Sequence, residues 1–354
     1  MGIFIETPGV LTTVQDGGRY GYEQFGVSPS GPMDPESFQL ANILVGNPRD
    51  LSALEATMLG PTLRFTRDNI IAITGGDMTP LLDEKPIPMD QAILVRSGSV
   101  LKLRAARTGC RTYVAFAGGL DVPEVMGSRA TGVQNRVGGL EGRKLAKGDE
   151  IPFLAPKTAL PRMEDRRTSH PMPAGKERVL RVILGPQDDA FTQQGLDTFL
   201  GQPYQVTNDF DRMGCRLDGP VIQHKVDGNI ISDGMVTGAI QVPTSGLPII
   251  MLAERQTVGG YTKIATVITA DLPVIGQCRP GDTIRFQSVS VSQAHRLWRE
   301  TRERLNELDR RLNAPPVQPQ TAAQPQAKGL GPVRHYRITV NGTVYETSIQ
   351  VVSQ

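Results

Sequence analysis

The fold is constrained most strongly by the stretch VQDGGRYGYEQFGVSPSGPMD, residues 14–34. It is rich in Gly, and a regular strand or helix is not expected because each Gly loses extra backbone entropy on folding. It also has too many Tyr and Phe, and too few Ser and Lys, for a flexible linker. We therefore expect an ordered loop that brings backbone N–H groups, Asp16 and Arg19 close to a ligand. A set of tight turns between strands is the open alternative.

Four later stretches have the same texture: GGLDVPEVMGSRATG (118–132), GGLEGRKLAKGD (138–149), DRMGCRLDGP (211–220) and GAIQVPTSGLPIIMLAERQTVGGY (238–261). Taken with the first, they resemble a carboxyltransferase-type family over residues 2–286. This family includes the C subunit of bacterial 5-oxoprolinase, the KipI antagonist KipA, allophanate hydrolase subunit 2 and half of the carboxyltransferase domain of urea carboxylase. The resemblance implies cyclophilin-like β-barrel architecture.

Composition narrows the class of protein. With 354 residues two domains are expected, and 38 Gly with 27 Pro indicate many turns and short strands. The net charge is +2 and no basic cluster alternates with aromatic residues, so a nucleic-acid partner is not expected. The N-terminus lacks the pattern of a signal peptide, and the longest apolar run is too short to span a bilayer. We expect a cytoplasmic protein with no membrane partner.

The three cysteines and four histidines do not suggest reactive chemistry. Cys110, Cys215 and Cys278 are far apart, no C-x-x-C occurs, and the histidines lack metal-ligand spacing. We expect the cysteines to be small buried residues and predict no metal site. His224 is the one histidine in a motif-bearing stretch, and an exposed loop histidine is the simpler interpretation.

The order of the elements predicts a mostly β protein with two β-barrel-like, cyclophilin-like domains and a few short helices. A helix is expected over residues 34–45, with Asp34 as N-cap and Pro35 at the first position, and a second short helix over 188–200. Along the chain we expect a β-rich domain (1–160), a basic connection (161–177), a β-barrel domain (178–290), an amphipathic helix (291–313), a linker (314–332) and a hairpin tail (333–354). Expected strands cover 70–73, 92–95, 100–103, 111–116, 179–184 and 262–268.

The C-terminal region differs from the rest. Trp298, Leu305 and Leu312 lie seven residues apart and form one apolar stripe, which we expect to pack on the body or on a partner protein. Asn341-Gly342 between two alternating runs is typical of a type I′ hairpin. This tail resembles the sequence that leads into a biotin carrier domain, although the chain has no Met-Lys pair to be biotinylated.

The chemistry available is that of carboxylate, guanidinium, amide and backbone groups. Neither a phosphate-binding G-x-x-x-x-G-K-[ST] loop nor a G-x-S-x-G elbow occurs. Guanidinium groups bind carboxylate or phosphate, and carboxamides suit an amide ligand. The predicted catalytic residues are Asp16, Arg212 and Gln241. The predicted substrate- or nucleotide-binding residues are Arg19, Arg129, Thr131, Arg255, Thr257, Tyr261 and Lys263.

Each predicted site residue has a structural alternative. A charged side chain can serve as an internal salt bridge or as a turn cap. We hold that alternative open for Asp16, Arg129, Asp211, Arg212 and Arg216. We further predict that Asp16, Arg19, Arg212, Gln241 and Tyr261 converge on one pocket, because each sits in a Gly-flanked stretch where backbone can approach a ligand.

The resemblance implies three functions. The first is a subunit of an ATP-dependent 5-oxoprolinase that opens 5-oxoproline to glutamate with Mg-bound ATP. Its implied partners are two further subunits, one KipI-like and one LamB/YcsF-like. The second is a carboxyltransferase half-domain that acts on urea or a related small amide, with carboxybiotin on a separate carrier. The third is a regulatory protein that binds a KipI-like partner.

Overall fold

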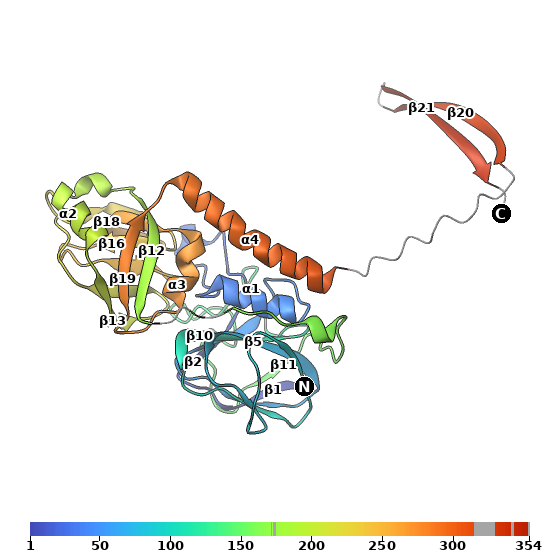
Figure 1. Ribbon diagram of the computed structural model, residues 1–354, viewed down its shortest axis with the longest axis horizontal. Helices are drawn as coiled ribbons and strands as arrows, with labels where there is room; N and C mark the ends of the chain where they lie inside the picture. Colours follow the sequence, from blue (N-terminus) through green and yellow to red (C-terminus); the bar gives the residue numbers. More distant parts are fainter. Residues whose placement is uncertain (171, 173–174, 315–329, 341–342, 353–354) are drawn as a thin grey trace. The chain divides into compact units, whose positions relative to one another are not determined.

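The computed structural model describes residues 1–354 except 171, 173–174, 315–329, 341–342 and 353–354 (Figure 1). Contacts divide the chain into two units, Met1–Asn313 and Ala314–Gln354. The second unit contains one antiparallel pair, β20 (Leu330–Val340) and β21 (Thr343–Val352). The expected hairpin is therefore present as two paired strands, and the Asn-Gly turn lies outside the described residues.

Two antiparallel sheets build the N-terminal half of the first unit. One contains, in spatial order, β11 (Glu150–Pro152), β1 (Gly2–Thr7), β4 (Thr62–Phe65), β9 (Val100–Lys102), β6 (Leu81–Leu82) and β7 (Lys85–Pro86). The other contains β2 (Leu11–Gln15), β3 (Ala53–Thr57), β10 (Thr108–Phe116), β5 (Asn69–Asp77) and β8 (Ala92–Val95). We call them together the N-terminal sheets.

The second of these sheets is buried on both faces. Side chains alternate along a strand, so Ile71 and Ile73 of β5 enter the core between the two sheets. Ile70 and Ala72 point the other way, into a core shared with α1 (Pro35–Leu44) and α4 (Val291–Asn313). This explains why β5 is a continuous apolar run instead of an alternating one.

Helix α1 begins where the sequence predicts. The side chain of Asp34 accepts a hydrogen bond from the backbone N–H of Ser37, and Pro35 occupies the first helical position. The expected second helix is broken into two pieces: a short 3₁₀ turn, η3 (Asp188–Ala190), and α2 (Gln193–Gly201). The break occurs because Thr192 caps α2 through its own hydroxyl, which accepts from the N–H of Gly195.

The C-terminal half is a closed barrel. Its ring contains β12 (Glu177–Leu184), β19 (Thr283–Ser288), β13 (Tyr204–Phe210), β14 (Gly214–Asp218), β17 (Ile249–Met251), β16 (Ala239–Val242) and β18 (Val258–Val267). The ring closes because β12 pairs in parallel with β19 and antiparallel with β18. One further strand, β15 (Asn229–Gly234), pairs with β18 outside the ring.

Helix α4 connects the two halves. It leaves the barrel after β19 and runs to α1 (Figure 1), where Leu305 and Leu312 are buried while Trp298 is 41% exposed. Two ion pairs lie at the edge of this contact between α4 and the N-terminal half: Arg304 with Glu36 at 3.0 Å, and Asp309 with Arg49 at 3.1 Å. The predicted mostly β fold, with few helices and a C-terminal helix before the hairpin, is confirmed. The remaining helical elements are η1 (Glu23–Phe25), η2 (Met163–Asp165), η4 (Thr269–Asp271) and α3 (Leu272–Gly276).

Candidate functional site

A buried ion cluster joins the N-terminal sheets to the barrel. Arg212, in the turn between β13 and β14, donates from Nε to Glu254 at 2.5 Å, from Nη1 to Glu55 and from Nη2 to the carbonyl of Gly31. Burial lowers the pKa of Arg212, but the carboxylates of Glu55 and Glu254 outweigh burial and raise it above its ordinary value. Arg212 therefore stays charged and holds the two halves together.

Gln277, just after α3, makes a second link between the halves. Its Oε1 accepts from the backbone N–H groups of Cys110 and Arg111, and its Nε2 donates to Asp34 and to the Arg111 carbonyl, all within 2.8–2.9 Å. Arg111 in turn donates to the carbonyl of Gly276. We call the contact surface that contains Gln277, Arg111 and the Arg212 cluster the seam. The polar side chains of the seam bond the two halves of the molecule to each other.

The Gly-rich loop turns its charged side chains inward. Asp16 accepts hydrogen bonds from the N–H groups of Gly18 and Arg129 and from the hydroxyl of Ser128. Arg19, 1% exposed, donates to the carbonyls of Val125 at 2.9 Å and Ala130 at 2.9 Å. Both residues thus bind the 125–131 segment. The loop is ordered, as expected, but Asp16 and Arg19 do not present their charges to a ligand.

Two consecutive glycines make this packing possible. A Cβ on Gly138 would lie 2.3 Å from Nη2 of Arg19, and one on Gly139 would lie 1.9 Å from the hydroxyl oxygen of Thr131. Both glycines have positive φ, +70° and +54°. The Gly-Gly pair that opens the 138–149 motif is therefore required by its contact with Arg19 and Thr131.

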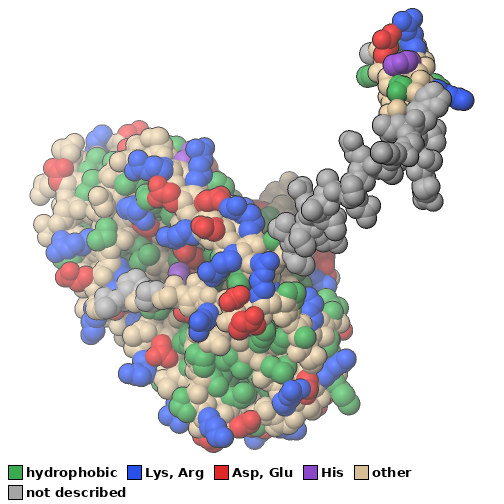
Figure 2. Space-filling view, turned by 45° about the vertical axis from the view of Figure 1, so that its right-hand side comes forward, with side chains coloured by type: hydrophobic (Ala, Val, Ile, Leu, Met, Phe, Trp, Pro, Cys, Tyr) green, Lys and Arg blue, Asp and Glu red, His purple; other side chains and the backbone are tan. Residues whose placement is uncertain are grey.

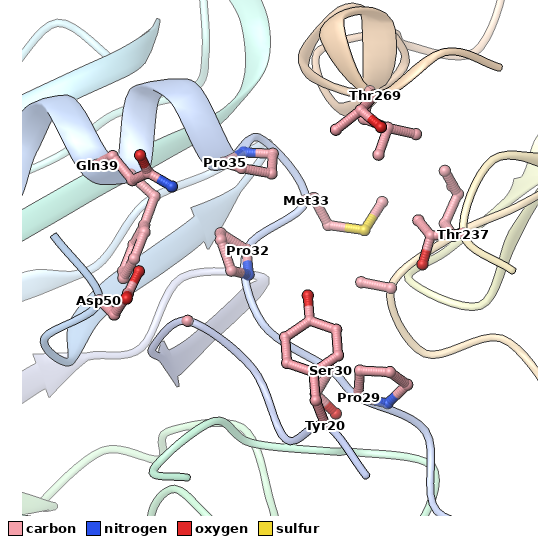
Figure 3. A pocket seen from close by; sticks show the side chains of 15 residues that line it. Tyr20, Pro29, Ser30, Pro32, Met33, Pro35, Gln39, Asp50, Thr237 and Thr269 are labelled. Carbon is pink, nitrogen blue, oxygen red and sulfur yellow. The ribbon is translucent and has the colours of Figure 1, made fainter. Parts of the chain in front are cut away.

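A first pocket, which we call the seam pocket, lies between the Gly-rich loop and the barrel (Figure 3). Its volume is 220 Å³. Figure 3 shows Met33 and the ring of Tyr20 on the loop side and Thr237 and Thr269 on the barrel side. Prolines and apolar side chains make up most of the remaining lining, together with the polar side chains of Ser30, Gln39 and Asp50.

A second pocket, the barrel pocket, has a volume of 370 Å³ and is lined by more polar groups. It lies over strands β13, β14, β16, β17 and β18. Its lining is contributed by Asn208, Asp209, Phe210, Asp211, Met213, Gly214, Arg216, Gln241, Ile249, Met251, Gln256 and Tyr261. The size is that of a site for a small molecule. Two of the predicted site residues, Gln241 and Tyr261, line it.

Gln241 is the unusual residue of the barrel pocket. Its neighbours on β16, Ile240 and Val242, belong to the barrel core, so Gln241 points to the opposite, outer face. The side chain is only 3% exposed, and its Nε2 has no hydrogen-bond partner among the described residues. Leaving such a group unpaired costs about 1–3 kcal/mol, which a bound ligand can recover.

The other predicted binding residues are engaged elsewhere. Arg129 pairs with Glu124 at 3.1 Å, the hydroxyl of Thr131 donates to the Val14 carbonyl, and Lys263 pairs with Asp233 at 2.5 Å. Arg255 donates from Nε to the carbonyl of Met235, while its Nη1 is buried without a partner among the described residues. Thr257 lies two residues beyond it, and its backbone carbonyl accepts from the N–H of Met235.

The predicted convergence on one pocket is wrong for three of the five residues. Gln241 and Tyr261 share the barrel pocket, but Asp16, Arg19 and Arg212 are absent from its lining and bind protein groups instead. Arg212 does not fit a role as an anion clamp, because all three of its nitrogens already bond carboxylate or carbonyl oxygens. Arg19 is 1% exposed and bonds carbonyls through Nε and Nη2, while its Nη1 has no partner among the described residues. Asp16 does not fit a role as base, since it accepts three hydrogen bonds from its own chain.

Two residues that form the seam, Glu55 and Gln277, were not predicted from the sequence. Glu55 lies in the strand ALEAT, between small apolar residues, and a lone carboxylate in such a strand is a signal for a buried cationic partner. Gln277 gives no comparable signal, because a Gln after a short helix is ordinary. The cysteines are free and buried as expected, and burial raises the pKa of Cys278 to about 12.

No helix among the described residues has the length and apolarity needed to cross a bilayer. The described residues also hold no cluster of three or more His, Cys, Asp or Glu side chains suited to a metal ion. Lys and Arg side chains alternate with Asp and Glu over the face seen in Figure 2, in keeping with the small net charge.

Comparison with known proteins agrees with this architecture. The chain is 35% identical to the C subunit of Escherichia coli 5-oxoprolinase over 305 residues, which are 86% of the chain and 97% of that relative. It is 35% identical to the C subunit of Haemophilus influenzae 5-oxoprolinase over 298 residues, 84% of the chain and 94% of the relative. The crystal structure of the Kluyveromyces lactis urea amidolyase matches with a TM-score of 0.81 at 33% identity, covering 87% of this chain and 20% of that one.

The sequence profile of the carboxyltransferase domain, subdomain A and B, matches residues 25–288. The matched residues include Arg212, Glu254 and Gln277 of the seam and every residue that lines the barrel pocket. The resemblance expected from the Gly-rich motifs is confirmed, and the chain belongs to the family of carboxyltransferase domains, subdomain A and B.

Proposed function

We propose that this chain is the C subunit of a 5-oxoprolinase-type hydrolase that opens 5-oxoproline to glutamate. The observation that carries the proposal is the sequence identity together with the share of the relative's length that is matched. The matched region spans 97% of the C subunit of E. coli 5-oxoprolinase but only 18% of the urea amidolyase of Saccharomyces cerevisiae. A protein that corresponds over nearly the whole length of a known subunit is best interpreted as one of the same kind.

The chain contributes a binding surface more than a nucleophile. The barrel pocket combines the buried carboxamide of Gln241, whose Nε2 has no partner among the described residues, with an exposed arginine, Arg216, and a half-exposed tyrosine, Tyr261. Such groups can hold and orient an amide while another group attacks it. We therefore assign substrate positioning to this chain, with the hydrolysis completed in a complex with KipI-like and LamB/YcsF-like subunits.

Three of the residues predicted to hold ATP are bonded in ways that do not suit a nucleotide site. Lys263 and Arg129 are paired with Asp233 and Glu124, and Thr131 is bonded to backbone. A triphosphate would need these donors free. We accordingly propose that Mg-bound ATP binds to a partner subunit. A cytoplasmic location is proposed with it, in keeping with three free thiols.

The test is reconstitution. The purified chain is mixed with its KipI-like and LamB/YcsF-like partners, 5-oxoproline and Mg-ATP, and glutamate release is measured. We expect glutamate only from the complete mixture and only with ATP. Hydrolysis by the single chain, or none by the complete set of folded subunits, would contradict the proposal.

The carboxyltransferase function has its own support, because the fold matches urea amidolyase with a TM-score of 0.81. In that alternative the same pocket holds urea or a related amide, and carboxybiotin arrives on a separate carrier. Transfer of labelled carboxylate from a carboxylated biotin carrier to urea, in the presence of the chain and its partner, would favour it over the hydrolase.

A further inference from the structure

The outer face of the barrel holds a carboxamide that the fold itself does not use. Gln241 is 3% exposed and its Nε2 has no partner among the described residues, although the side chain lines a polar cavity of 370 Å³. Buried polar groups are almost always paired within the protein, so an unpaired one in the wall of a cavity indicates a ligand position, which the ligand reaches when the end of the side chain turns toward the cavity.

Gly259 on β18 shapes the place where this carboxamide lies. A Cβ at Gly259 would lie 2.5 Å from Nε2 of Gln241 and 2.5 Å from Cε of Met235. Hence only glycine leaves room for the amide in its present position. Gly260, the next residue, is different: the nearest atom to a Cβ there is the Ile230 carbonyl oxygen at 3.6 Å, an ordinary contact.

The chemistry of a carboxamide selects the ligand. A primary carboxamide presents an N–H donor and a C=O acceptor on one edge. The complementary edge has a C=O beside an N–H on the same side, as in a lactam ring or a ureido group, and the two edges form a pair of parallel hydrogen bonds. A simple carboxylate offers two acceptors and leaves the glutamine oxygen without a donor.

The charged side chains at the rim of the barrel pocket favour a ligand with one negative charge. Arg216 is exposed and has no ion pair among the described residues, so it can receive a carboxylate of the ligand. Asp211 is less available, because its Oδ1 already accepts from the N–H groups of Met213 and Gly214. Asp209 is the other carboxylate on the rim, and it disfavours ligands with more than one negative charge.

We propose that the barrel pocket binds a small ligand through a cis-amide edge, lactam or ureido, which pairs with the carboxamide of Gln241. Where the ligand also has a carboxylate, as 5-oxoproline does and urea does not, Arg216 receives it. The lactam form rests on the proposed function, since 5-oxoproline has both groups; the ureido form is urea or a related compound. Gly259 is a positioning residue that acts through Gln241.

Calorimetric titration of the full chain, alone and in its complex without ATP, tests this with three probes: 5-oxo-L-proline, urea and L-proline. L-Proline keeps the ring and carboxylate but lacks the lactam carbonyl. We expect 5-oxoproline or urea to bind and L-proline not to bind. Binding of 5-oxoproline assigns the lactam, and binding of urea alone assigns the ureido group.

Two glycine variants provide the matched control. Gly259→Ala displaces only the flexible ends of Gln241 and Met235, so the fold should be kept, and affinity should fall at least tenfold. Gly260→Ala should bind like the wild type. Gln241→Leu should lose binding as Gly259→Ala does, and melting temperatures verify that all three variants fold.

Three results would overturn the inference: no cis-amide probe binds either preparation, L-proline binds as tightly as 5-oxoproline, or Gly259→Ala binds like Gly260→Ala. The proposed function fails separately. If the chain binds 5-oxoproline through Gln241 but the complete complex releases no glutamate, the binding site stands and the hydrolase does not. If the complex is active and Gly259→Ala leaves its KM unchanged, the hydrolase stands and the site does not.

Discussion

Two buried glutamines of similar exposure have opposite surroundings. Gln277 in the seam is 4% exposed and has hydrogen bonds on both its oxygen and its nitrogen, four in all. Gln241 in the barrel pocket is 3% exposed, and its nitrogen has none among the described residues. Gln277 therefore helps to hold the two halves together, whereas we propose that Gln241 binds a ligand.

The largest effect is expected at the most heavily bonded residue of the seam. Arg212→Met leaves Glu55 and Glu254 buried without their cation, and we expect the free energy of unfolding to fall by about 3–5 kcal/mol. Urea denaturation measures it. Arg216→Met, at an exposed arginine of the barrel pocket, should change stability by no more than about 0.5 kcal/mol.

Neutralising the partners checks that unpaired charge is the cause. Adding Glu55→Gln and Glu254→Gln to Arg212→Met should restore part of the lost stability, since no carboxylate then remains buried without a cation. A change below about 1 kcal/mol for Arg212→Met alone would show that the seam does not depend on this cluster.

The glutamine pair gives the most direct comparison. Gln277→Leu leaves two N–H groups, the Arg111 carbonyl and an Asp34 oxygen buried without their partner. We therefore expect the free energy of unfolding to fall by about 2–4 kcal/mol. Gln241→Leu removes an amide that has no partner on its nitrogen among the described residues, and stability should stay the same or rise by up to about 1 kcal/mol. Equal losses in the two variants would erase the distinction between seam and pocket.

A smaller effect on the free energy of unfolding, which depends on pH, is expected at His224. Its side chain is partly buried. Its Nε2 lies 3.1 Å from the Val242 carbonyl and 3.1 Å from the Thr262 hydroxyl, and its ring centroid lies 4.6 Å from that of Phe191. Burial lowers the pKa of His224, and the bond to Val242 opposes this only in part. The folded protein therefore binds the proton less readily than the unfolded chain.

The sign follows from that difference. As pH falls below the unfolded pKa of about 6.5, the unfolded chain gains a proton first and stability drops. His224→Gln should remove this part of the pH dependence, and because the ring is partly exposed the effect should stay below about 0.5 kcal/mol at pH 5. Denaturation curves of both proteins at pH 5 and pH 8 measure it; identical pH dependence would contradict the expectation.

The smallest effect is expected from removing the second unit. Deleting 314–354 should change the melting temperature by less than about 5 °C, because the buried cores are built from residues up to Leu312. Calorimetry of the full and shortened chains compares them. A larger drop would mean that the hairpin contributes to the folded body.

Local signals in the sequence were sufficient for much of the fold. The cap at Asp34, the strand over 92–95 and the long C-terminal helix all depend on neighbours along the chain, and they lie where expected. The closing of the barrel could not be predicted in this way, because β12 pairs with a strand about a hundred residues later, Glu177 opposite Thr283. Long-range pairing leaves no periodic trace in either strand.

Of the residues predicted to share one pocket, only two line the barrel pocket. Gln241 and Tyr261 were placed in one pocket by their Gly- and Pro-flanked stretch. Arg212 has an equally suggestive stretch, but its partner Glu55 is 157 positions away, and no local pattern distinguishes an arginine that binds a ligand from one that binds its own chain.

The strand pairings also set the order in which the molecule can be completed during synthesis. Strand β1 meets β11 at Pro152, so the N-terminal sheets can close once about 153 residues have emerged. The barrel must wait for Ser288, and Leu312 of α4 covers α1 later still. At ribosomal speeds this leaves on the order of ten seconds in which Glu55 is hydrated and α1 lacks its cover. A nascent chain stalled in that interval would expose an apolar helix, which is the form that a chaperone recognises.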